Sequence, residues 1–273
     1  MIETDLQVLP AKVAAEFALL PEVVAVVLAG SKGSALSDAR SDIDLYVYAT
    51  REPSITWRAE LARKFGEHAS VGNTFWESGD EWVVSGSGIV VDIMYRSPTW
   101  IEEQLDRVLV RHQASVSYST CFVFNVLHSQ ILFDRVGWFA SLQTKAAQPY
   151  PEPLRQAIVA KNHPILRRTL SSYQHQIEVA LQRGDQVSVN HRITALLAGY
   201  FDILFAVNRL FHPGEKRLVA YVLAKCPKRP ADFERHVNGV LHAGAKPEVL
   251  ARINDLLDGL DALLIAERLI GPE

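Results

Sequence analysis

The first hundred residues alternate between helical repeats of apolar positions and short apolar runs. Apolar side chains recur at helical spacing over residues 6–20, and Pro21 ends this predicted helix. An uninterrupted apolar run predicts a strand over residues 23–29, a second strand is predicted over residues 42–49, and the next helical repeat covers residues 55–65.

Three shorter strands are expected next, over residues 73–77, 81–85 and 89–95. Gly-containing turns separate them, which is typical of a β-meander. An order of helix, two strands, helix and meander predicts a mixed β-sheet with helices on one side.

From residue 97 onwards the apolar pattern is almost entirely helical. Pro149, Pro151 and Pro153 separate two groups of predicted helices. The expected ranges are 100–113, 118–131, a helix ending near 147, and then 154–183, 186–211, 215–225, 230–242 and 246–269. The predicted fold class is therefore α+β, with a mixed-sheet domain at 1–97 and an α-helical bundle at 98–273.

Composition narrows the protein class. The 273 residues are 48% hydrophobic and 22% charged, and the net charge of -3 gives no general attraction to nucleic acid or anionic membranes. The two cysteines, Cys121 and Cys226, lie far apart and form no metal-ligand motif, which favours a reducing cytoplasm. We also expect no signal peptide and no membrane span, because the N-terminus is acidic and no apolar run reaches about 18 residues.

Two aspartates interrupt the second predicted strand. Asp42 and Asp44 are two residues apart, so their side chains project from the same face of that strand. Asp92 similarly interrupts the apolar strand at 89–95. Carboxylates brought close together repel unless a cation lies between them, and Mg2+ prefers such hard oxygen ligands. We therefore predict a magnesium site at Asp42, Asp44 and Asp92.

A Gly-Ser pair follows the first predicted strand. Gly30 allows the backbone to approach an anion closely, and Ser31 offers a hydroxyl and a backbone N–H. Nucleotidyl transfer uses a phosphate-binding turn together with a magnesium site.

The same residues carry a family resemblance. Gly30-Ser31, ten intervening residues and then Asp42-Ile43-Asp44 resemble the signature of the DNA polymerase β-like nucleotidyltransferase superfamily. Asp92 resembles the third carboxylate of that superfamily, which comes from a later strand. The helical half is similar in architecture to the second domain of aminoglycoside and lincosamide adenylyltransferases and of related uncharacterised two-domain proteins.

The resemblance implies roles for individual residues. Gly30 and Ser31 would hold the β- and γ-phosphates of ATP or another nucleoside triphosphate, and Asp42 and Asp44 would coordinate Mg2+. Asp92 would bind metal or act as the general base. Lys216, with Arg217 beside it, could reach the triphosphate from the helical domain, or could simply belong to a charged first turn of a helix.

The hairpin formed by the first and second meander strands is acidic. Glu77 and Glu81 could form a wall for a cationic acceptor, and Glu77 is an alternative general base to Asp92. A plain two-faced hairpin explains the same residues.

The predicted activity is Mg2+-dependent transfer of a nucleoside monophosphate, AMP in the first instance, to a hydroxyl of a small acceptor such as an antibiotic. The alternatives are a protein AMPylator of the antitoxin type and a non-catalytic nucleotide-binding module. Polymerisation on nucleic acid is disfavoured because no basic stripe with interleaved aromatic residues is present. The sequence identifies neither the acceptor nor the oligomeric state.

Overall fold

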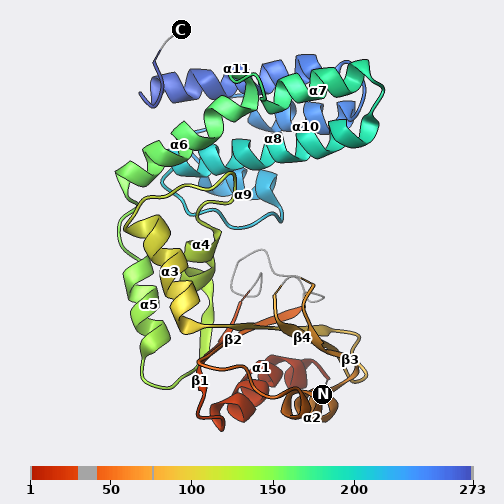
Figure 1. Ribbon diagram of the computed structural model, residues 1–273, viewed down its shortest axis with the longest axis vertical. Helices are drawn as coiled ribbons and strands as arrows, with labels where there is room; N and C mark the ends of the chain where they lie inside the picture. Colours follow the sequence, from red (N-terminus) through yellow and green to blue (C-terminus); the bar gives the residue numbers. More distant parts are fainter. Residues whose placement is uncertain (1, 30–41, 76, 272–273) are drawn as a thin grey trace. The chain divides into compact units, whose positions relative to one another are not determined.

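The chain folds into two compact units, each built from two segments (Figure 1). The computed structural model describes residues 2–29, 42–75 and 77–271. Unit 1 comprises Met1–Asp106 and Asn125–Gln148, and unit 2 comprises Arg107–Phe124 and Pro149–Glu273. The chain thus enters unit 2 after Asp106, returns to unit 1 at Asn125 and enters unit 2 again at Pro149. The sequence predicted one boundary, at residue 97.

Unit 1 is organised around a six-stranded mixed sheet in the order β3-β4-β5-β2-β1-β6. Its strands are β1 (Val23–Leu28), β2 (Ile43–Ala49), β3 (Gly66–Asn73), β4 (Gly79–Val84), β5 (Val90–Arg96) and β6 (Gln130–Asp134). β2 and β5 pair in parallel, whereas every other neighbouring pair of the sheet is antiparallel. The parallel pair places the beginnings of β2 and β5 at the same end of the sheet.

Two helices cover one face of this sheet (Figure 1). They are α1 (Ile2–Ala18) and α2 (Ile55–Phe65), and α2 begins where the Ser54 hydroxyl accepts a hydrogen bond from the Trp57 N–H. Side chains of both helices join alternate strand residues in one apolar core. That core contains Val13 and Phe17 of α1, Leu61 of α2, Ile43, Leu45 and Val47 of β2, and Val91 and Ile93 of β5.

On the opposite face of the sheet, a helix covers the carboxyl end of β2. Tyr48 points away from the α1–α2 core and contacts Trp138 and Phe139, each with ring centroids 5.3 Å apart. Both aromatic residues belong to α5 (Trp138–Ala146), which follows β6. Helices therefore lie on both faces, and the expectation of helices on one side was incomplete. The helix expected at 118–131 ends earlier, at His128, and is followed by β6, which pairs with β1.

The first meander strand was predicted in the wrong place. It was expected at 73–77, but β3 occupies Gly66–Asn73, directly after α2. β3 is an edge strand and most of its residues are exposed, so it lacks the apolar alternation on which the prediction depended.

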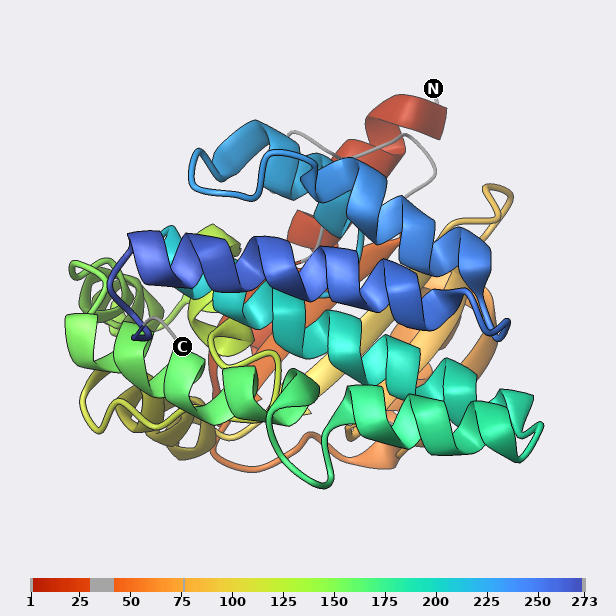
Figure 2. The same cartoon turned by 90° about the horizontal axis from the view of Figure 1, so that it is seen from above.

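Unit 2 is helical among its described residues (Figure 2). α3 (Pro98–Leu109) and α4 (Cys121–His128) each contribute residues to both units. The remaining helices are α6 (Glu152–Arg167), α7 (Tyr173–Gln182), α8 (Gln186–Val207), α9 (Leu218–Lys225), α10 (Phe233–Ala243) and α11 (Val249–Ala266). The single helix expected at 154–183 is in fact two helices, because Ser172 caps a new helix by accepting a hydrogen bond from the His175 N–H.

α8 is the central helix of unit 2. Twelve of its residues are buried, in a core shared with α6, α7, α10 and α11. A mixed-sheet unit and a helical unit together confirm the predicted α+β class. None of the helices found in residues 2–29, 42–75 and 77–271 has the length and apolar character that a membrane crossing requires.

A buried ion pair joins α2 to β4. Arg58 donates to both carboxylate oxygens of Asp80, at 2.9 Å from Nε and 2.6 Å from Nη2. Asp80 also accepts hydrogen bonds from the Tyr95 hydroxyl at 2.7 Å and the Gly72 N–H at 2.8 Å. The side chains of Arg58 and Asp80 are 2% and 1% exposed, so either charge left alone would be buried without compensation.

We expect Arg58→Ala to lower the free energy of unfolding by about 3–5 kcal/mol, since it leaves the Asp80 carboxylate buried and unpaired. Urea denaturation measures this change. Arg63→Ala, which removes an exposed arginine from the same helix, should change the value by less than about 0.5 kcal/mol. Equal effects of the two variants would contradict a special role for the buried pair.

Candidate functional site

The parallel pairing of β2 and β5 brings two of the predicted site residues together. Asp44 lies directly beside Asp92 in the register of the two strands. Ile43 and Leu45 on one strand, and Val91 and Ile93 on the other, point into the α1–α2 core. The two carboxylates therefore share the opposite face of the sheet. The strands were predicted separately, and their pairing confirms only that the two aspartates are neighbours.

A third carboxylate extends this row. Glu81 on β4 lies beside Asp92 on the side away from Asp44. Its neighbours in sequence, Asp80 and Trp82, are buried in the opposite direction, so Glu81 projects from the same face as the two aspartates. The sequence suggested Glu81 as part of an acidic wall but not as a neighbour of Asp92. Its position beside Asp92 follows from the register of β4 against β5, for which the sequence offered no local signal.

The row is electrostatically unfavourable as it stands. The pKa of Asp92 is raised from 3.8 to about 6 by burial and, next, by the negative charges of Asp44, Glu81 and Asp42. Within the described residues neither Asp92 nor Glu81 forms an ion pair. A cation placed against this face would relieve the repulsion.

Glu77, the alternative general base, is held by Arg96. Its two carboxylate oxygens accept hydrogen bonds from Arg96 Nε at 2.7 Å and Nη2 at 2.9 Å. The Arg96 guanidinium also lies 3.9 Å from the centroid of the Tyr46 ring. Both carboxylate oxygens of Glu77 are therefore engaged by the Arg96 guanidinium.

The remaining predicted site residues lie before β2, outside the described residues or in unit 2. Asp42 is exposed and immediately precedes β2, on the same side as Asp44 by its spacing. Gly30 and Ser31 lie outside the described residues. Lys216 is exposed in unit 2, next to Arg217, whose φ of 55° precedes α9. The predicted phosphate contacts of Gly30, Ser31 and Lys216 stay predictions.

The donor set suits a hard divalent cation. Across the described ranges 2–29, 42–75 and 77–271, no three His, Cys, Asp or Glu side chains are grouped as a ready metal-binding cluster. Mg2+, however, is commonly held by one or two carboxylates together with water and substrate phosphates. Asp44 and Asp92 provide such a pair, and the raised pKa of Asp92 marks the place where positive charge is favoured.

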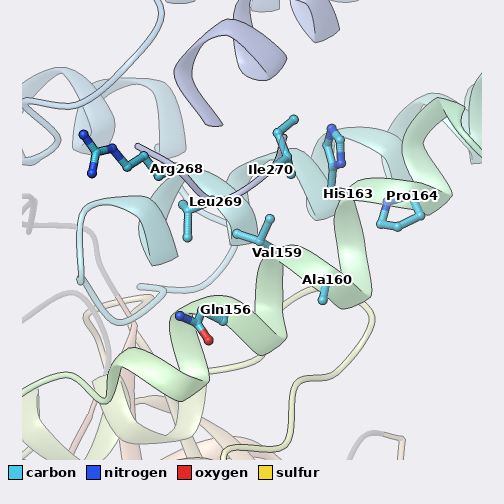
Figure 3. A pocket seen from close by; sticks show the side chains of 8 residues that line it. All are labelled: Gln156, Val159, Ala160, His163, Pro164, Arg268, Leu269 and Ile270. Carbon is cyan, nitrogen blue, oxygen red and sulfur yellow. The ribbon is translucent and has the colours of Figure 1, made fainter. Parts of the chain in front are cut away.

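A hollow of about 310 Å³ is formed by residues of unit 2 alone (Figure 3). Its walls come from α6 between Gln156 and Pro164 and from the segment Arg268 to Ile270. His163 at its edge is hydrogen-bonded through Nε2 to Asp261 at 2.5 Å. Of the described site residues predicted from the sequence, none lines this hollow.

Comparisons with known proteins give two similarities. Residues 116–218 match a family model described as "Domain of unknown function (DUF4037)". Among solved structures, the chain is similar to that of a nucleotidyltransferase-like protein from Exiguobacterium sibiricum 255-15, with 14% sequence identity and a TM-score of 0.45. That similarity covers 98% of this chain and 76% of the other. No curated protein matches the chain.

The raised pKa of Asp92 predicts a pH-dependent stability. Since Asp92 holds its proton more tightly when folded, the folded state loses stability as pH rises from about 4 to about 6. A shift of this size corresponds to nearly 3 kcal/mol, and partial exposure of the site reduces it to about 1–2 kcal/mol. We expect Asp92→Asn, measured by urea denaturation with a chelator present, to be more stable than wild type by that amount at pH 7 and similar to it at pH 4.

The matched control is Asp255→Asn, which removes an exposed aspartate from α11. It should leave the difference between pH 4 and pH 7 unchanged. A variant Asp92→Asn that is less stable than wild type at pH 7 would show that the carboxylate is favourably compensated and not repelled.

Proposed function

We propose that this protein is a nucleotidyltransferase that moves a nucleoside monophosphate from a nucleoside triphosphate, ATP in the first instance, to a hydroxyl group of a small acceptor. The observation that carries the proposal is the pairing of Asp44 with Asp92 on adjacent parallel strands, extended by Glu81 on β4. The strand register brings three carboxylates together on one face of the sheet. They suit a reaction in which positive charge is recruited together with its substrate.

In this proposal Asp92 is the general base. Asp92 lies beside Asp44 in the strand register, and unlike Glu77 it is not engaged by Arg96. Asp92 accepts the proton of the acceptor hydroxyl, and the oxygen forms a bond to the α-phosphorus. The bond from that phosphorus to the bridging oxygen breaks, and pyrophosphate leaves with the electron pair.

Asp44 and Asp92 would hold Mg2+, with Asp42 near the same edge. When bound, Mg2+ would neutralise phosphate charge and lower the pKa of the attacking hydroxyl. Glu77 keeps Arg96 against Tyr46 and leaves proton transfer to Asp92. Gly30, Ser31 and Lys216 are the proposed phosphate contacts, on the strength of the sequence alone.

The direct test is transfer from ATP labelled at the α-phosphate. The full chain is incubated with Mg2+, labelled ATP and a panel of hydroxylated small molecules, including aminoglycosides and lincosamides, and products are identified by mass. We expect label on a small molecule, and a roughly 100- to 10,000-fold lower rate for Asp92→Asn. Asp255→Asn should retain the wild-type rate. Label found only on protein would replace this function with protein AMPylation, and wild-type turnover by Asp92→Asn would remove Asp92 from the mechanism.

Binding of Mg2+ gives a second test that does not depend on the acceptor. Saturating Mg2+ should stabilise the wild type by about 1–3 kcal/mol, because the ion binds the folded carboxylate pair and not the unfolded chain. Thermal unfolding with and without Mg2+ measures this. Asp44→Asn and Asp92→Asn should lose most of the shift, whereas Glu60→Gln, an exposed change on α2, should keep it. A full shift in both site variants would place the cation elsewhere.

A further inference from the structure

Unit 2 contains a larger hollow, of about 860 Å³, of whose lining residues the proposed reaction uses only Lys216. It is lined by Tyr118, by residues of α8, α9 and α10, and by the segment Glu215–Arg217 before α9, all within unit 2. Its lining includes Leu197 and Phe201 of α8 and Val237 and Leu241 of α10. The volume falls within the range of about 300–1,000 Å³ that is typical of small-molecule sites.

Large apolar side chains around this hollow are exposed to solvent. Tyr118 is 38% exposed, Leu223 39% and Leu241 54%, and all three line it. Single exposed apolar residues are common, but several around one concave site indicate a binding surface. The hollow therefore offers apolar contact area that the fold leaves open.

The backbone of Tyr118 and of the residue before it is held in an uncommon conformation. Ser117 and Tyr118 have φ values of 63° and 52°, in the left-handed region that few non-glycine residues adopt. A buried polar network fixes them there. Asp202 accepts hydrogen bonds from the Ser119 N–H at 3.0 Å and the Ser119 hydroxyl at 2.7 Å, and Asn162 accepts one from the Ser117 N–H at 2.8 Å.

The Tyr118 ring is supported as well as its backbone. It packs on His212 with ring centroids 5.0 Å apart, and His212 is fully buried. His212 is itself fixed, since its Nδ1 accepts a hydrogen bond from the Gly214 N–H at 3.1 Å. Its ring also packs against that of Phe205, with ring centroids 4.8 Å apart. A tyrosine held in this way at the edge of a hollow is preorganised for contact with a ligand.

We propose that the hollow between α8, α9 and α10 binds a small molecule built on a planar apolar ring system, with Tyr118 as a preformed ring contact. Lys216 also lines the hollow and is exposed, and it forms no ion pair with the described residues. An acidic substituent on the ring would complement it. Asp202 is a positioning residue, because it acts through the Ser117–Ser119 segment.

The probe for this site is anilinonaphthalene sulfonate, a planar apolar ring system with one acidic group. Titration of the full chain should give saturable fluorescence at one probe per chain. We expect Tyr118→Ala and Leu241→Glu each to weaken this binding about tenfold or more, and Lys216→Ala to weaken it several-fold. Leu170→Glu removes a leucine that is 94% exposed elsewhere in unit 2 and should leave the affinity unchanged.

Three results would overturn the proposal. Wild-type affinity in both Tyr118→Ala and Leu241→Glu would place the probe elsewhere. An equal loss in Leu170→Glu would show non-specific binding. A dimer in sedimentation that Leu241→Glu converts to a monomer would assign the hollow to a second copy of the chain. Far-ultraviolet circular dichroism of each variant confirms that a lost signal is not lost folding, and none of these outcomes depends on nucleotidyl transfer.

Discussion

Backbone hydrogen bonds between the parallel strands β2 and β5 hold Asp44 and Asp92 side by side, although their charges repel. The raised pKa of Asp92 corresponds to a few kcal/mol of unfavourable interaction at most. On the other face of β2, Ile43, Leu45 and Val47 are fully buried, and burial of each contributes about 1.5–3 kcal/mol. The apolar face therefore outweighs the repulsion, and the strand tolerates Asp44 beside Asp92.

The two faces of the sheet treat acidic residues differently. Asp80, on the α1–α2 face, is surrounded by donors from Arg58, Tyr95 and Gly72. Asp92, one strand away on the opposite face, has other carboxylates as its nearest charged neighbours. Both aspartates lie in strands, so their different surroundings come from the packing of α2 and the register of β4 against β5.

Sequence periodicity was sufficient to predict the elements that have a strong apolar pattern. α2 occurs over the predicted residues, and β1, β2 and β5 differ from prediction by one residue at an end. The edge strand β3 and the break between α6 and α7 were missed, because β3 is polar on both faces and the break depends on a single cap at Ser172. The neighbouring positions of Asp44 and Asp92 could be suspected from sequence, whereas those of Glu81 and of the Glu77–Arg96 pair depend on strand register. Register is set by contacts far apart in the chain, which a local pattern does not contain.

Asp202 in unit 2 shows a third use of a buried acid. Burial raises its pKa to about 6, while hydrogen bonds from Ser119 act in the opposite direction. Like Asp80 it is surrounded by donors, which come from Ser119 in the segment with the uncommon backbone and from Asn162 of α6. A carboxylate that is enclosed by donors fixes the backbone that supplies them, and one that faces other carboxylates is left to attract charge from outside. By this criterion Asp80 stabilises the fold, Asp202 shapes a surface, and Asp92 is the acid on which the proposed reaction depends.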